Sequence, residues 1–375
     1  MKITNVKWNK NLIFYLIAFI VISIFSIYSA QTYLPSYLGN LALKQLIWYL
    51  IGIVLILLIV KIGHEKIVKY SSYLYITGII LLLMLLLIAE PINNSKCWFI
   101  IPGVGSFQPS EFMKIFLILL ASVTINNTVQ GKKKLTLKDE IVIILKTALL
   151  FLIPSILTFL EPDTGVVLIY FIICISILFV SCLRKRWFII SLIGIAIVIT
   201  SILYLYFVKQ DVFVNLFGTN LFYRIDRLLD WRNGTGMQLE NSLAAIGSSG
   251  IFGHGFNKTP IYFPESGTDF IFAVYASNFG LVGAIILVGI ILFFDITIIN
   301  IALKAKNNTD KFICTGIISM LVFGQFQNIG MTLGIVPITG ITLPFISYGG
   351  SSLLSYMFVL GLLFSIDYKN NKTLN

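Results

Sequence analysis

The feature that most constrains this sequence is a series of long apolar runs. A segment that crosses a bilayer has no water for its backbone, so it must pair its own N–H and C=O groups, and an α-helix does this within one run. About 18 apolar residues are enough to cross a hydrocarbon core roughly 30 Å thick. The alternation with a period of two residues that a membrane β-barrel needs is absent. The sequence therefore predicts an all-α, polytopic membrane protein with about ten transmembrane helices, over residues 12–30, 45–61, 71–89, 111–126, 141–160, 165–183, 187–208, 269–296, 312–333 and 350–366.

Composition agrees with this fold class. Hydrophobic residues make up 58% of the 375 residues and charged residues only 11%, which is more apolar surface than one soluble core buries. No repeat and no appended soluble domain is evident, so we expect one transmembrane domain over residues 1–375 with a long extracellular loop at about 209–268. The first apolar run follows a charged start and lacks a small-residue cleavage site, which predicts a retained helix rather than a removed signal.

The charged residues predict the orientation in the membrane. With the N-terminus in the cytoplasm, most of the 27 Lys and Arg residues fall in cytoplasmic segments, as the positive-inside rule requires. This bias explains the net charge of +11 without a nucleic-acid partner and predicts that both termini are cytoplasmic. Most acidic residues instead lie at or near the predicted outer face, either as ordinary solvation of outer loops or as part of a functional site.

Four predicted outer segments carry more polar, Gly and Pro residues than short turns need, at 98–111, 161–165, 209–268 and 334–352. In the first, Glu111 and Lys114 are three residues apart, so on a helix they share a face and can form an ion pair. A structural interpretation also fits, with Ser110 as helix cap and Lys114 extending outward to water. Both interpretations can hold together.

Asp269 stands where the chain enters an apolar run. A carboxylate there is partly desolvated, which raises its pKa and prepares it to accept a proton or hold a cation. The alternative is structural, with Thr268 as a cap and Asp269 in the first helical turn. Asp163 in the second segment fits an ordinary turn, and the hydroxyl groups of 334–352 fit either phosphate contacts or close packing of small residues.

The sequence resembles the SEDS family (FtsW/RodA/SpoVE; shape, elongation, division and sporulation) of bacterial cell-wall glycan polymerases over nearly its whole length. The resemblance is carried by five motifs in the family's order: QPSEFMK at 108–114, EPDTG at 161–165, NSLAAIGSSGIFGHGF at 241–256, PESGTDFIFAV at 264–274 and PITGITLPFISYGGSS at 337–352. The family usually carries paired glutamates where this chain has Ser277 and Asn278, which puts partner or cation interactions in question.

This resemblance implies a peptidoglycan glycosyltransferase that polymerises lipid II at the outer face of a bacterial cytoplasmic membrane and releases undecaprenyl diphosphate. It also implies a class B penicillin-binding protein, a transpeptidase, as partner. The family's essential acidic residue falls on Asp269, as the base for the acceptor sugar's 4-hydroxyl. The departing diphosphate needs a positive group, for which the candidates are Lys114, Arg227 and a divalent cation, Mg²⁺ or Mn²⁺. We expect further substrate contacts from residues at the same face: Glu111, Asp163, Glu265, Thr268, Ser347 and Ser351.

Two other functions remain open at this point. A transporter, such as a flippase for a lipid-linked precursor, should place ionisable residues near the membrane midplane. The main candidates, Lys146 and Asp295, are expected within about a turn of the cytoplasmic edge, which favours chemistry at the outer face. A non-catalytic scaffold would be indifferent to Asp269. The sequence does not separate elongation, division and sporulation roles.

Overall fold

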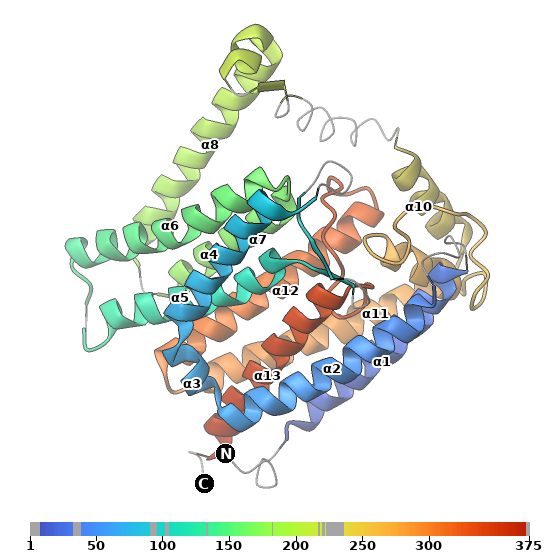
Figure 1. The fold of residues 1–375 in the computed structure, drawn as a ribbon, viewed down its shortest axis with the longest axis horizontal. Coiled ribbons are helices and arrows are strands. Elements are labelled where there is room, and N and C mark those ends of the chain that lie inside the picture. Colours follow the sequence, from blue (N-terminus) through green and yellow to red (C-terminus); the bar gives the residue numbers. More distant parts are fainter. Residues whose placement is uncertain are drawn as a thin grey trace.

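The computed structural model describes residues 8–32, 39–90, 96–101, 105–132, 134–181, 183–216, 218–219, 222 and 236–372. Ten long helices dominate it (Figure 1): α1 Lys10–Gln31, α2 Leu41–Ile62, α4 Ser71–Ile88, α5 Pro109–Val129, α6 Leu137–Leu160, α7 Thr164–Val180, α8 Lys185–Val208, α11 Ile271–Lys304, α12 Asn308–Thr332 and α13 Gly350–Lys372. Each overlaps one predicted span, so the all-α, polytopic fold class is confirmed.

Membrane-crossing length separates one helix from the rest. Among the described residues, nine helices are long and apolar enough to span a membrane, and α7 is shorter at 17 residues. With a rise of about 1.5 Å per residue, 17 residues cover roughly 26 Å, close to the lower limit for a transmembrane helix.

Several boundaries differ from the predicted ones. Helices α11 and α13 continue through polar residues to Lys304 and Lys372, because an apolar run marks only the part of a helix that lies in lipid. Two predicted loop regions contain regular structure. The first outer segment forms a hairpin of strands β1 (Phe99–Ile101) and β2 (Gly105–Phe107), and the long loop contains helix α10 (Met237–Ser248). A short helix, α3 (His64–Lys69), follows α2.

Helices α5, α12 and α13 are the most enclosed of the spans. Helix α13 packs against α2, and α12 packs against α7, α11 and α5. Helix α8 stands away from the other helices (Figure 1), and Tyr206 is the one buried residue that the structure describes on it. Its start is fastened by the buried carboxylate of Glu140, which accepts hydrogen bonds from Arg184, Arg186 and Trp187.

Helix α11 is broken near its beginning, at Gly280, where φ is 64° and ψ is −163°. The chain at 250–255 lies against this break and forms four backbone hydrogen bonds of 3.0–3.1 Å with residues 277–282. A Cβ atom on Gly253 would lie 2.3 Å from the carbonyl oxygen of Asn278, so only glycine permits this approach. The break therefore depends on a segment that precedes it in sequence by about 25 residues.

The other end of the bundle carries a polar cluster. Asn9, just before α1, donates to Asp367 near the end of α13 at 3.2 Å. His64 lies 3.3 Å from Asp310, and Lys369 lies 2.6 Å from Glu65. These contacts place the start of α1 and the end of α13 at the same end of the bundle, as two termini on one side of a membrane require.

Candidate active site

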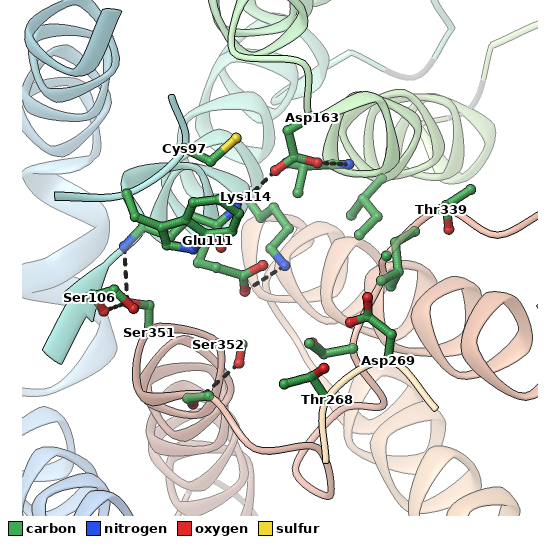
Figure 2. A pocket seen from close by; sticks show the side chains of 18 of the residues that line it. Cys97, Ser106, Glu111, Lys114, Asp163, Thr268, Asp269, Thr339, Ser351 and Ser352 are labelled. Atoms are coloured by element: carbon green, nitrogen blue, oxygen red, sulfur yellow. Dashed lines mark hydrogen bonds and ion pairs between the residues drawn. The ribbon is translucent and has the colours of Figure 1, made fainter. Parts of the chain in front are cut away.

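A cavity of about 720 Å³ opens among the ends of α5, α7 and α13 and the segments that precede α7 and α11. Figure 2 shows its side chains, which come from parts of the chain far apart in sequence. Its volume is typical of a small-molecule site. Seven of the nine predicted site residues line it: Glu111, Lys114, Asp163, Glu265, Thr268, Asp269 and Ser351.

Glu111 and Lys114 form the predicted ion pair, with 2.8 Å between Lys114 Nζ and Glu111 Oε2. The Lys114 side chain is only 1% exposed and its Nζ lies 5.4 Å from the centre of the Tyr356 ring, so the alternative in which it extends outward to water is wrong. Ser110 is not the helix cap, because α5 begins two residues earlier than predicted, with Gln108 as N-cap and Pro109 in the first turn. The pair is therefore a feature of the cavity wall.

Asp163 is the N-cap of α7, where its Oδ1 accepts a hydrogen bond from Val166 N at 3.1 Å. Its Oδ2 accepts from Gln108 Nε2 at 2.9 Å, which joins the starts of α5 and α7. Burial raises the pKa of Asp163 to about 6, and the nearby Glu111 carboxylate adds to the shift. Gln108 N also donates to Ser351 Oγ at 3.0 Å, so this residue connects two walls of the cavity.

Asp269 differs from the other carboxylates that line the cavity, because those of Glu111, Asp163 and Glu265 each have a protein partner. Its side chain faces the cavity (Figure 2) and makes no hydrogen bond or ion pair with any residue that the structure describes. Burial, together with the neighbouring carboxylates of Glu265 and Asp163, raises its pKa to about 7. The structural alternative is wrong: the N-cap of α11 is Phe270, and the Thr268 hydroxyl donates to Glu265 Oε2 at 2.6 Å rather than capping the helix.

The remaining two predicted site residues do not line the cavity in the described structure. Ser347 is buried, and its hydroxyl is used within the protein: it donates to Thr268 O at 2.6 Å and accepts from Leu343 N at 2.8 Å. Ser347 therefore supports the backbone of the segment that carries Asp269. The expected contact between its side chain and the substrate is corrected accordingly. Arg227 lies outside the described residues.

Gln108 and Tyr356 are two of the site residues that sequence reasoning missed. Gln108 belongs to the QPSEFMK motif at 108–114. Its position just before a helix could have indicated that its side chain lies at the site. Tyr356 lies within an apolar run of α13 and carried no signal, because only packing against α5 brings its ring to Lys114.

The structure brings together no group of three or more His, Cys, Asp or Glu side chains suited to a metal ion among the residues it describes. Three of the four cysteines, Cys97, Cys174 and Cys314, are buried and free, and Cys182 lies outside the described part. The described donors therefore do not form a metal cage by themselves, and the expected Mg²⁺ or Mn²⁺ stays a prediction.

Asp295 lies in the second half of α11, outside the cavity. It lies nine residues before the end of α11, about two and a half turns, and its Oδ1 accepts from Gln325 on α12 at 3.2 Å. Ser277 and Asn278, where the resemblance led us to expect glutamates, are buried at the break in α11 and do not line the cavity.

Comparison with known proteins identifies the family. The family model described as "Cell cycle protein" (FtsW/RodA/SpoVE) matches residues 9–372. The probable peptidoglycan glycosyltransferase FtsW of Coxiella burnetii is 33% identical over 341 residues, covering 87% of this chain and 86% of that protein. Stage V sporulation protein E of Bacillus subtilis is 29% identical over 392 residues, covering 97% and 98%.

Solved structures show the same fold. A chain of a peptidoglycan synthase complex that coordinates polymerization and crosslinking superposes with a TM-score of 0.81 at 25% identity, covering 97% of this chain and 98% of that one. The Rod shape determining protein RodA of Thermus thermophilus superposes with a TM-score of 0.70 at 24% identity, covering 97% and 98%. With a family match over nearly its whole length and a cavity built from the quoted motifs, this chain belongs to the FtsW/RodA/SpoVE (SEDS) family.

Proposed function

We propose that the cavity is the active site of a peptidoglycan glycosyltransferase, which polymerises lipid II into glycan strands at the outer face of the bacterial cytoplasmic membrane. Both termini would lie in the cytoplasm. The observation that carries the proposal is an unpaired carboxylate, Asp269, facing a cavity that also holds the buried cation of Lys114. A base and a positive group are the two parts that glycosyl transfer from a diphosphate donor requires.

Asp269 is the general base. It takes the proton from the 4-hydroxyl of the acceptor sugar as that oxygen attacks the anomeric carbon of the donor, whose bond to the diphosphate oxygen breaks. A base works best when its pKa lies near the operating pH, and burial raises the pKa of Asp269 to about 7. Because no described residue pairs with it, the carboxylate is available to the hydroxyl.

Lys114 supports departure of undecaprenyl diphosphate. It is the basic side chain lining the cavity in the described part of the chain, and a fixed ammonium stabilises the negative charge that gathers on the phosphate oxygens. Glu111 holds Lys114 at 2.8 Å, and Ser355 Oγ donates to the same Glu111 oxygen at 3.2 Å, so the ammonium is held in position before substrate arrives.

A class B penicillin-binding protein is the proposed partner. The likeness to a chain of a peptidoglycan synthase complex that couples polymerization to crosslinking supports it. The partner's identity would decide whether the protein serves elongation, division or sporulation.

The test is polymerisation of purified lipid II by the detergent-solubilised protein with its cognate class B partner. We expect glycan strands from the wild type and none from Asp269→Asn. Asp295→Asn is the matched control: it removes a buried carboxylate from α11, the helix that follows Asp269, keeps a hydrogen-bonding partner for Gln325, and should leave polymerisation unchanged. EDTA, followed by Mg²⁺ or Mn²⁺, tests the predicted divalent cation.

Two other results would favour a flippase or a scaffold over a polymerase. Transport of lipid-linked precursor in proteoliposomes that is abolished by Asp295→Asn, without strand formation, would favour the flippase, since an ionisable residue within a span is typical of transport pathways. Activity of the partner that depends on the protein but is indifferent to Asp269→Asn would favour the scaffold.

A further inference from the structure

The short segment that carries the proposed base is held from outside at three consecutive carbonyls, those of residues 267–269. The first two are bound by the loop before α13, through Tyr348 N at 2.9 Å and Ser347 Oγ at 2.6 Å. The third carbonyl, that of Asp269 itself, is bound by the side-chain amide of Asn328 on α12 at 2.8 Å. The backbone of the base is therefore fixed from two elements.

Asn328 makes a second bond of the same kind. Its Nδ2 also donates to Ile341 O at 2.8 Å, so both amide hydrogens are used on backbone carbonyls. The orientation of this amide follows from its surroundings, because the opposite orientation would set its oxygen against two carbonyl oxygens. One side chain thus ties the segment of Asp269 to the cavity wall formed by residues 339–342.

That wall is close to the carboxylate. Gly340, the residue before Ile341, lines the cavity, and a Cβ atom placed on it would lie 3.5 Å from Asp269 Oδ2. The hydrogen bond from Asn328 to Ile341 O therefore holds the part of the wall that stands next to the carboxylate.

Packing alone does not explain an asparagine here. Asn328 is 0% exposed, and its Oδ1 has no hydrogen-bond partner among the described atoms. Burying an unsatisfied amide oxygen is unfavourable, and an apolar side chain of similar size would avoid it. What the amide adds is its two donated hydrogen bonds.

We infer that Asn328 is a positioning residue for the reaction, holding the Asp269 carboxylate at a set distance from the cavity wall through the carbonyls of Asp269 and Ile341. The inference rests on the proposed function, in which Asp269 is the base. Asn328 itself does not line the cavity and acts through Asp269.

The matched control is its neighbour, Gln327. It is 6% exposed, lies on the same helix, and binds the same loop through Nε2 to Pro337 O at 2.7 Å, with no bond to the segment of Asp269. Asn328→Leu and Gln327→Leu each replace a buried amide by an apolar side chain and remove its hydrogen bonds to the loop. Only Asn328→Leu also removes a hydrogen bond to the carbonyl oxygen of Asp269.

The kinetic test is lipid II polymerisation by the two variants with the class B partner. We expect Asn328→Leu to lower kcat about a hundredfold with little change in KM, since misplacing a reacting group by about 1 Å costs on this order. Gln327→Leu should stay within about threefold of wild type in both constants. Equal kcat in the two variants, or a rise in KM with kcat unchanged, would overturn the inference.

Hydrogen exchange supplies a readout that does not depend on activity. Asn328→Leu should accelerate amide exchange in both 264–272 and 338–348, whereas Gln327→Leu should leave 264–272 at the wild-type rate. Unchanged exchange over 264–272 in Asn328→Leu refutes the positioning role. If that exchange rises while the wild type forms no strands, the proposed function fails and the anchoring by Asn328 stands.

A second variant covers failure of Asn328→Leu to fold. Asn328→Ser is smaller and keeps one donor, so its kcat should fall between wild type and the leucine variant. A serine variant with wild-type kcat and wild-type exchange over 264–272 would also overturn the inference.

Discussion

Lys114 Nζ lies 2.8 Å from Glu111 Oε2, and the two side chains are 1% and 8% exposed. A buried ion pair of this kind has both charges removed from water, so each depends on the other. The pair also forms part of the cavity wall, so we expect its loss to affect activity as well as stability.

We expect Lys114→Met to lose both stability and activity. Breaking one side of a buried pair leaves an uncompensated charge and costs about 3–5 kcal/mol of unfolding free energy. Removing a group that stabilises developing charge lowers kcat by about 10²–10³-fold. Thermal unfolding in detergent and lipid II polymerisation measure the two effects.

The double variant Glu111→Met/Lys114→Met separates these effects. Apolar side chains of similar volume in place of a buried pair often keep stability near the original value. Unfolding should therefore return close to that of the wild type while polymerisation stays lost. Wild-type polymerisation by the double variant would show that Lys114 does not stabilise the departing diphosphate.

Polymerisation should depend on pH in the direction set by Asp269. Only the deprotonated carboxylate accepts a proton, and burial together with nearby carboxylates raises the pKa of Asp269 to about 7. The kcat/KM for lipid II should therefore rise from about pH 6 to about pH 8, with roughly a tenfold loss per pH unit on the acid side. Rates that stay flat over this range, measured with the same detergent and partner, would argue against Asp269 as the base.

Gly340→Ala should raise the pKa of the proposed base, Asp269. The new methyl group would lie 3.5 Å from Asp269 Oδ2, further desolvating the carboxylate and moving its pKa and the acid limb of the rate profile upward. One unit of pKa corresponds to about a tenfold loss of rate on the acid side.

Gly334→Ala is the control for this change. Gly334 has φ +70° against +72° at Gly340, so both variants carry similar backbone strain, but the Cβ at Gly334 would meet Leu239 at 3.6 Å instead of the carboxylate. Its pH profile should match that of the wild type. The same shift in both variants would mean that backbone strain, not contact with Asp269, changed the profile.

Gly253→Ala should destabilise the protein far more than Gly250→Ala. A Cβ on Gly253 would stand 2.3 Å from Asn278 O, so the broken part of α11 must move, at about 3 kcal/mol or more. Gly250 also has a positive φ, +58°, but its Cβ would meet nothing within 4 Å, which leaves only the strain of about 1–2 kcal/mol. Denaturant unfolding in detergent compares them, and similar losses would show that the close approach at the break does not contribute to stability.

The sequence by itself determined the helices. Lipid demands that each spanning segment pair its own backbone, so length and apolar content were enough to locate all ten, and the motifs placed seven of nine expected residues around one cavity. It also indicated the Glu111–Lys114 pair, because a spacing of three residues is a local property of a helix.

Only the tertiary structure decided which way side chains turn and what they meet across the fold. Lys114 points inward because α13 places Tyr356 and Ser355 beside the pair, and Ser347 lies beneath the site because its hydroxyl is taken by Thr268 and Leu343. The bond from Asn328 to Asp269 joins residues 59 apart in sequence. Such contacts arise from helix packing rather than from local propensity, so the hydropathy of the sequence does not predict them.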